Sequence, residues 1–91
     1  MMLRDEIEAR LRAALAPEML AIEDDSHLHA GHAGAREGAH FTVTIVSSRF
    51  TGVHRVARHR LVYHALAELM RSGIHALAID ARAPGEGEDV R

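Results

Sequence analysis

The sequence contains no cysteine and no lysine, and its only aromatic residues are Phe41, Phe50 and Tyr63. Without cysteine the chain can form no disulfide and has no thiolate for catalysis or metal binding. With so few aromatic rings, the core must consist mainly of aliphatic side chains and methionine, and 47% of the chain is hydrophobic. Ninety-one residues of this composition predict one domain with a single modest core.

The sequence also lacks the features of a membrane protein and of an enzyme. No apolar run approaches the roughly 20 residues that a spanning helix needs. The opening MMLRDEIEARL is acidic from its fifth residue and has no apolar signal segment. There is no G-x-S-x-G elbow and no phosphate-binding loop. We therefore expect a cytoplasmic protein that does not enter a membrane and catalyses no reaction.

Charge is distributed unevenly along the chain, although the net charge is only −2. Residues 38–67 contain four arginines and no acid, whereas residues 1–37 contain four arginines and eight acids. A cationic middle between acidic ends predicts a local anion-binding face. It does not predict a protein that coats nucleic acid non-specifically.

Hydrophobic periodicity divides the first part of the chain into a helix, a strand and a loop. Apolar residues recur at helical spacing within residues 2–16, and Pro17 ends this helix because proline restricts the residue before it. The alternation around Leu20 and Ile22 predicts a short strand. Residues 27–39 contain three glycines and no apolar period, which predicts a long flexible loop.

The second part of the chain begins with the clearest strand, in which Phe41, Val43 and Ile45 alternate with less apolar residues. A turn at Thr51-Gly52 follows. We then expect a helix from about residue 53 with a break near Ala57, ending at residue 73 with a left-handed glycine. Its buried side should consist of Val62, Ala65, Leu66 and Leu69.

A last strand is predicted from Ile74 to Ala81. From Pro84 onward the chain is acidic and nearly without apolar residues, so residues 84–91 are expected to be a disordered tail behind a domain of residues 1–83. The predicted order is α-β-β-α-α-β, which indicates an α+β fold.

Histidine is over-represented, with eight residues among 91. His27, His29 and His32 fall in the glycine-containing loop, and His75 falls at the start of the last strand. Neutral imidazole binds zinc, copper, iron and nickel, and it can replace thiolate at an iron–sulfur cluster. The alternative is that the loop histidines are merely solvated, and that His75, which has the parity of Leu77, is a histidine at the edge of the core.

The arrangement of several motifs resembles the BolA proteins. The residues that carry the resemblance are the Phe50–Gly52 turn, Arg-His-Arg at residues 58–60 and His-Ala-Leu at residues 75–77, supported by Asp25–His32 and Ala39–Phe41. The resemblance covers nearly the whole chain, from the first helix to about Arg82. It implies a KH-like arrangement in which helices cover one face of a three-stranded mixed sheet.

The resemblance also implies a set of metal ligands. In BolA proteins a loop residue and the histidine of the His-Ala-Leu strand bind the metal, which here indicates His29 and His75, with His32 close enough to replace His29. Two imidazoles supply half of the four ligands of a 2Fe–2S cluster. The family completes the set with a monothiol glutaredoxin and with glutathione bound to it. The resemblance therefore implies a binding module that is a monomer by itself. With the glutaredoxin it would form a heterodimer that shares one 2Fe–2S cluster.

DNA binding is the alternative function, since some members of the family are described as DNA-binding regulators. The segment from Phe50 to Arg60 contains no acid, and its candidate contact residues are Arg55, Arg58, His59 and Arg60. Against this function, the chain is negative overall and has no aromatic pair on which bases could stack. These arginines could instead bind acids of the first helix or hold the turn in place.

A third possibility is a separate zinc, copper or nickel site formed by His27, His29 and His32 alone, since short histidine-rich segments bind such metals. This spacing within a flexible loop fixes no coordination geometry. A separate metal site is therefore the weakest of the three interpretations.

Overall fold

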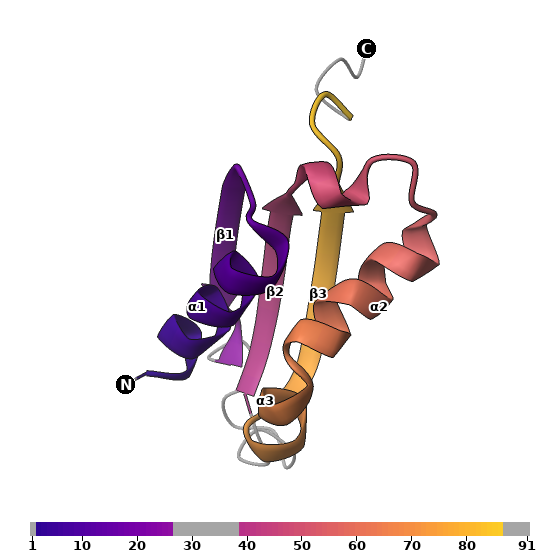
Figure 1. Cartoon of the computed structure of the whole chain (residues 1–91). Coiled ribbons are helices and arrows are strands. Elements are labelled where there is room, and N and C mark those ends of the chain that lie inside the picture. Colours follow the sequence, from indigo (N-terminus) through magenta and orange to yellow (C-terminus); the bar gives the residue numbers. More distant parts are fainter. Residues whose placement is uncertain (1, 27–38, 87–91) are drawn as a thin grey trace.

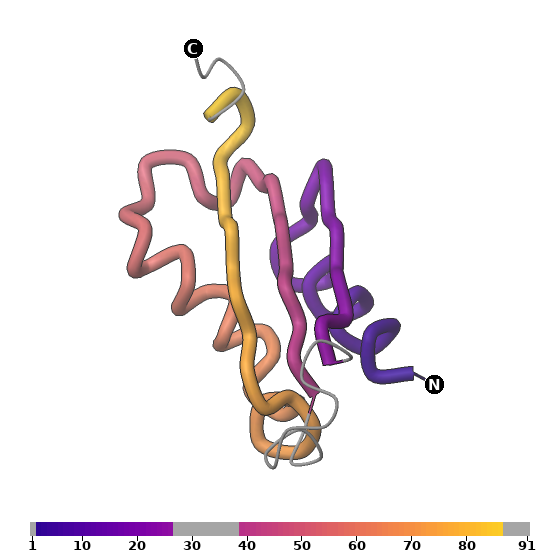
Figure 2. The backbone as a smooth tube through the Cα atoms, turned by 180° about the vertical axis from the view of Figure 1, so that it is seen from behind, coloured from indigo at the N-terminus to yellow at the C-terminus, as the bar shows by residue number. Residues whose placement is uncertain are grey.

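The computed structural model describes residues 2–26 and 39–86. The elements, in chain order, are α1 (Leu3–Leu15), β1 (Met19–Asp24), β2 (Ala39–Val46), the 3-10 helix η3 (Ser48–Phe50), α2 (Arg55–Ala65), α3 (Ala67–Ser72) and β3 (Ile74–Arg82). The strands form one sheet whose front face is covered by the helices (Figure 1). In the view from behind, the strands lie in front of the helices (Figure 2). The predicted α+β class and element order are therefore confirmed.

The sheet is mixed, with β2 in its centre. β1 pairs with β2 in the antiparallel direction, and β3 pairs with β2 in the parallel direction. A parallel pair needs a long crossover connection, and η3, α2 and α3 provide it. This crossover returns the chain to the end of the sheet where β2 began, so β2 and β3 start side by side. Within the described residues, no helix is both long and apolar enough to cross a membrane.

Helix α1 buries the apolar side that its sequence spacing predicts, with Ile7, Leu11 and Leu15 at most 4% exposed. The helix ends because Pro17 disfavours right-handed helical backbone at the preceding residue. Ala16 takes a left-handed conformation with φ 43°, and its N–H donates to the Arg12 carbonyl. The predicted range of residues 2–16 is thus correct to one residue at each end.

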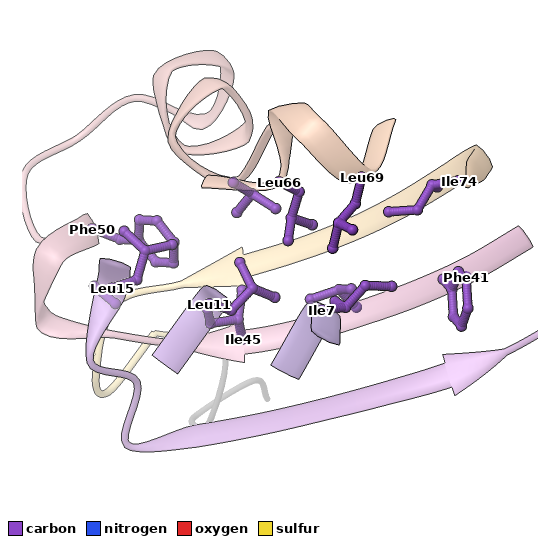
Figure 3. Packing of buried hydrophobic residues seen from close by; sticks show 12 residues of the cluster. Ile7, Leu11, Leu15, Phe41, Ile45, Phe50, Leu66, Leu69 and Ile74 are labelled. Atoms are coloured by element: carbon purple, nitrogen blue, oxygen red, sulfur yellow. The ribbon is translucent and has the colours of Figure 1, made fainter. Parts of the chain in front are cut away.

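One core lies between the helices and the sheet. Phe41, Val43 and Ile45 of β2 are buried, as their alternation predicts. They meet residues of all the helices in the cluster drawn in Figure 3. Phe50, from the predicted turn, is fully buried in η3 and fills the space beside the end of α1. The turn motif therefore contributes to the core as well as reversing the chain.

The predicted position of the break in the crossover helix is wrong. The break expected near Ala57 lies instead at Leu66, between α2 and α3, and α2 starts at Arg55, two residues after the expected start. The break at Leu66 is shallow, because its N–H still donates to the carbonyls of Val62 and Tyr63. Val62, Leu66 and Leu69 are all buried across it.

Gly73 does not adopt the predicted left-handed conformation, because its φ is −149°. Space explains the glycine better than backbone strain. A Cβ atom at this position would lie 3.2 Å from Cδ2 of Leu3, at the start of α1. A larger residue here would require the end of the Leu3 side chain to shift by a few tenths of an ångström, whereas glycine fits without adjustment.

Residues 84–86 also differ from the expectation of a disordered tail. They form a turn with Gly85 at φ 90°, and the N–H of Ala83 donates to Glu86. Residues 87–91, the rest of the predicted tail, lie outside the described residues. The boundary after residue 83 as a domain limit stays a prediction.

Candidate functional site

The starts of β2 and β3 bring two histidines together, and we call this pair, His40 and His75, the histidine end of the sheet. Their ring centroids are 5.1 Å apart, with the ring planes inclined by 47°. His75 is exposed and His40 is half-buried. The sequence predicted His75 as a candidate ligand but assigned no function to His40, which is 35 positions away in the chain.

A β-bulge directs His75 out of the core. Ala39 pairs with Ile74, but His40 pairs with Ala76, so one extra residue of β3 lies opposite the step from Ala39 to His40. Such a bulge changes the direction of side chains along the strand. Ile74 is consequently buried, whereas His75 is exposed. The alternative interpretation of His75 as a core-edge histidine, based on strand parity with Leu77, is therefore wrong.

Backbone hydrogen bonds fix His40 in place. Its N–H donates to Oγ of Ser26 over 3.1 Å, and its carbonyl accepts from the N–H of Asp25 over 2.7 Å. The N–H of Ala39 donates to the Gly73 carbonyl over 3.2 Å. Ser26 and Ala39 are thus both held beside the histidine pair. The predicted loop ligands His29 and His32 lie between these two residues in the sequence, outside the described residues.

The donor set at the histidine end is incomplete for a metal cluster. Within residues 2–26 and 39–86, no group of three or more His, Cys, Asp or Glu side chains could hold a metal ion. His75 is exposed on a strand and can reach a partner, but the chain has no thiolate. Among the described residues, this end therefore offers imidazole nitrogens and no thiolate as donors to a metal.

The opposite end of the sheet gathers cationic side chains and one acid, Glu86, which binds Arg58. We call this group the arginine end; it consists of Arg55, Arg58, His59, Arg82 and Glu86. Figure 1 shows the start of α2 and the end of β3 at this end of the sheet. A groove of about 630 Å³ lies between them and is lined by these five residues together with Ile79, Asp80 and Ala81.

Arg58 is bound almost entirely by the protein itself, and its side chain is only 12% exposed. Its Nε donates to the Val53 carbonyl over 2.7 Å, and its Nη1 donates to the Ala81 carbonyl over 3.1 Å. Both Nη atoms donate to the Glu86 carboxylate, over 2.6 and 2.8 Å. The guanidinium also lies 5.9 Å from the centroid of the Phe50 ring. Arg58 therefore joins the turn, β3 and the C-terminal turn.

The carboxylate of Glu86 is stabilised in its charged form. Hydrogen bonds from the Arg58 guanidinium, and next from the Ala83 N–H, lower the pKa of Glu86 to about 2. The same pair raises the pKa of Arg58 above its ordinary value. A bidentate guanidinium–carboxylate pair is the strong form of such an interaction.

The other predicted nucleic-acid contacts are more accessible than Arg58. Arg55 and Arg60 are exposed on α2, and His59 is half-buried beside the groove. Arg82, which was not predicted, forms two hydrogen bonds with Asp80. The structure thus brings Arg55, Arg58 and His59 to one groove, but it neutralises Arg58 with an acid that the sequence placed in a disordered tail.

Comparison with known proteins shows that the chain is similar to one protein family. The family model described as "BolA-like protein" matches residues 11–86. The curated protein named BOLA1, chloroplastic, from Arabidopsis thaliana is 48% identical over 81 residues, which are 85% of this chain and 51% of that protein. This chain therefore spans about half the length of that relative.

A second relative is more nearly equal in length. The Escherichia coli protein named DNA-binding transcriptional regulator BolA is 42% identical over 91 residues, covering 100% of this chain and 85% of the relative. Among solved structures, BolA1 from Arabidopsis thaliana is similar with a TM-score of 0.83 and 44% identity, covering 94% of this chain and 96% of that one.

Proposed function

Since the chain belongs to the BolA-like family, we propose that it is an adaptor that binds a monothiol glutaredoxin and shares a 2Fe–2S cluster with it. We assign the ligands of this chain to His75 and to His29 or His32. The adaptor handles clusters or senses iron and is not itself an enzyme. The observation that supports this function most is the bulge that turns His75 out of the core at the start of β3.

The absence of cysteine makes a partner necessary for this function. A 2Fe–2S cluster takes four protein or small-molecule ligands, and two imidazoles can replace two thiolates. The chain contributes histidines alone. A glutaredoxin cysteine and the thiolate of bound glutathione complete the set. Soft thiolate ligands favour an iron–sulfur cluster over a simple zinc site.

The position of Ser26 supports a ligand that follows it closely in the sequence. Ser26 is bound to the backbone of His40 at the same end of the sheet as His75. His29 is only three positions after Ser26, and three residues extend at most about 11 Å. A ligand at His29 therefore starts from an anchor that already lies at the histidine end.

Co-expression with a monothiol glutaredoxin tests the proposal. We expect the chain alone to be colourless and the purified complex to be a brown heterodimer with visible absorption and circular dichroism of a 2Fe–2S cluster. A chain that remains a separate colourless monomer, with iron and glutathione supplied, would contradict the proposed function.

DNA binding is the second candidate, because the Escherichia coli relative is named a DNA-binding transcriptional regulator. Arg55 and Arg60 are exposed at the start of α2 and could contact phosphates. Arg58 supports this function less, because its guanidinium is engaged by Glu86 and two carbonyls. Titration of the free chain with duplex DNA at several salt concentrations tests this candidate.

The cytoplasmic location expected from the sequence also remains a proposal. One relative carries the name chloroplastic, and location can be checked by fractionating cells that produce the tagged chain.

A further inference from the structure

We propose that His40 and His75 together bind one divalent first-row cation, such as Zn²⁺, in the chain alone. This site shares His75 with the proposed cluster function but needs neither glutaredoxin nor the histidines of segment 27–38. His40 is the new ligand. It belongs to the Ala39–Phe41 motif, but only the structure shows that its ring lies beside that of His75.

The separation of the two rings matches joint ligation of one ion. A zinc ion lies about 2.0–2.1 Å from an imidazole nitrogen, and hence about 3.2 Å from the centroid of that ring. Two imidazoles at a tetrahedral angle then have centroids about 5.2 Å apart. The centroids of His40 and His75 are 5.1 Å apart, and the ring planes are inclined by 47°. No movement of β2 relative to β3 is needed to bring the rings to this separation.

The backbone holds the two ligands rigidly. His40 lies in the central strand, with its N–H bound by Ser26 and its carbonyl by Asp25. His75 follows Ile74, which pairs with Ala39 and is buried in the core. Ligands on strands are held more precisely than ligands on loops, which reduces the entropy lost on binding. His40 and His75 meet this criterion, because both belong to strands.

The surroundings leave room for the remaining ligands of the ion. His75 is exposed, so water can complete the coordination there. A groove of about 300 Å³ adjoins His40 and includes Asp25 and Thr42 among its lining residues. A zinc ion with only two protein ligands keeps open positions, and it should therefore be bound reversibly and be exchangeable.

A zinc titration of the free, full-length chain tests the inference, with histidine ring signals followed by NMR. We expect the rings of His40 and His75 to shift first. His40→Gln and His75→Gln should each weaken zinc binding by about 10-fold or more. His64→Gln, on the exposed end of α2, is the matched control and should leave the affinity unchanged.

A second control separates this site from the loop. The chain with His27→Gln, His29→Gln and His32→Gln together should keep its zinc affinity within about twofold. Loss of binding in this variant, or full binding in His40→Gln, would overturn the inference. Should His40→Gln lose the native amide spectrum, His75→Gln provides the same comparison at an exposed position.

The outcome is distinguishable from that of the proposed function. A brown complex with glutaredoxin, combined with a zinc titration that leaves His40 and His75 unshifted, would overturn the inference and leave the cluster function standing. Zinc binding at His40 and His75, combined with no complex between the chain and glutaredoxin, would support the inference and contradict the cluster function.

Discussion

The two ends of the sheet both gather polar side chains but use them differently. At the arginine end, Arg58 is 12% exposed and its guanidinium donates to two carbonyls and to Glu86. At the histidine end, His75 is exposed and is turned outward by a β-bulge. Arg58 is thus satisfied within the chain, whereas His75 presents its side chain to solvent.

This difference separates a side chain that is engaged within the fold from one that is exposed, within one set of motifs. Arg-His-Arg and His-Ala-Leu are equally prominent in the sequence. The contacts of Arg58 resemble those of a residue that holds a fold together, since it links the turn at Val53, strand β3 and the C-terminal turn. His75 contacts the ring of His40 and has no such structural network among the described residues.

The largest expected effect is at the histidine end. His75→Ala should abolish the visible absorption and circular dichroism of the cluster in the glutaredoxin complex, because the exposed strand ligand is lost. The fold should remain, since the side chain packs in no core. His64→Ala, also exposed, is the control and should keep the spectrum. An unchanged cluster spectrum in His75→Ala would show that His75 is not a cluster ligand. The proposed difference in function between the two ends would then be lost.

The next largest effect is at the arginine end and concerns stability. Arg58→Ala removes four hydrogen bonds, and it leaves the Val53 and Ala81 carbonyls without this donor. We expect the free energy of unfolding to fall by about 1–3 kcal/mol, measured by urea denaturation.

The matched control for this prediction is Arg60→Ala, two positions away on an exposed part of α2. It should change the free energy of unfolding by less than about 0.5 kcal/mol. Equal effects of the two substitutions would mean that the contacts of Arg58 contribute little in solution.

A smaller effect concerns DNA. If the free chain binds duplex DNA through the start of α2, the combined substitution of Arg55→Ala and Arg60→Ala should lower the slope of log affinity against log salt by about 2. Arg71→Ala, exposed in α3 at the other end of the sheet, should leave the slope unchanged. A slope that responds only to Arg71→Ala would move any DNA contact away from the arginine end.

The fold could largely be predicted from the sequence, because its signals are local. The alternation around Val43 and the helical spacing around Ile7 each describe one element, and both are confirmed by burial. The errors arose where tertiary contacts decide the backbone. Gly73 was assigned a left-handed conformation that helix ends often have, whereas its φ is −149° and it lies close to Leu3 from the other end of the chain.

The candidate site was less predictable, because its geometry depends on pairing between distant segments. The parity of His75 was counted along a regular strand, and only the register against β2 reveals the bulge. The neighbour His40 could not be identified without that register. Glu86 was missed because its segment is acidic and polar, which is typical of a tail, and only the position of Arg58 shows what this acid binds.

The smallest expected effect is the pH dependence of the Arg58–Glu86 pair. The pKa of Glu86 is lowered to about 2 in the folded protein, against an ordinary value of 4.5, chiefly by the hydrogen bonds from Arg58. A carboxyl group whose folded pKa is depressed stabilises the fold above its unfolded pKa, and this contribution is lost as pH falls toward the folded value. The loss should be modest, because the Glu86 side chain is 46% exposed and solvent screens the pair.

The measurement is the difference in unfolding free energy between the unmodified chain and Glu86→Gln, which keeps the shape but cannot ionise. We expect the unmodified chain to be more stable at about pH 6, and the difference to shrink at about pH 3 as protons compete with Arg58 for the carboxylate. About 1 M salt should reduce the difference at the higher pH as well. A difference that stays constant with pH would show that the carboxylate charge contributes nothing. Arg58 would then be held by the carbonyls of Val53 and Ala81 alone, and the arginine end would keep its contacts without its ion pair.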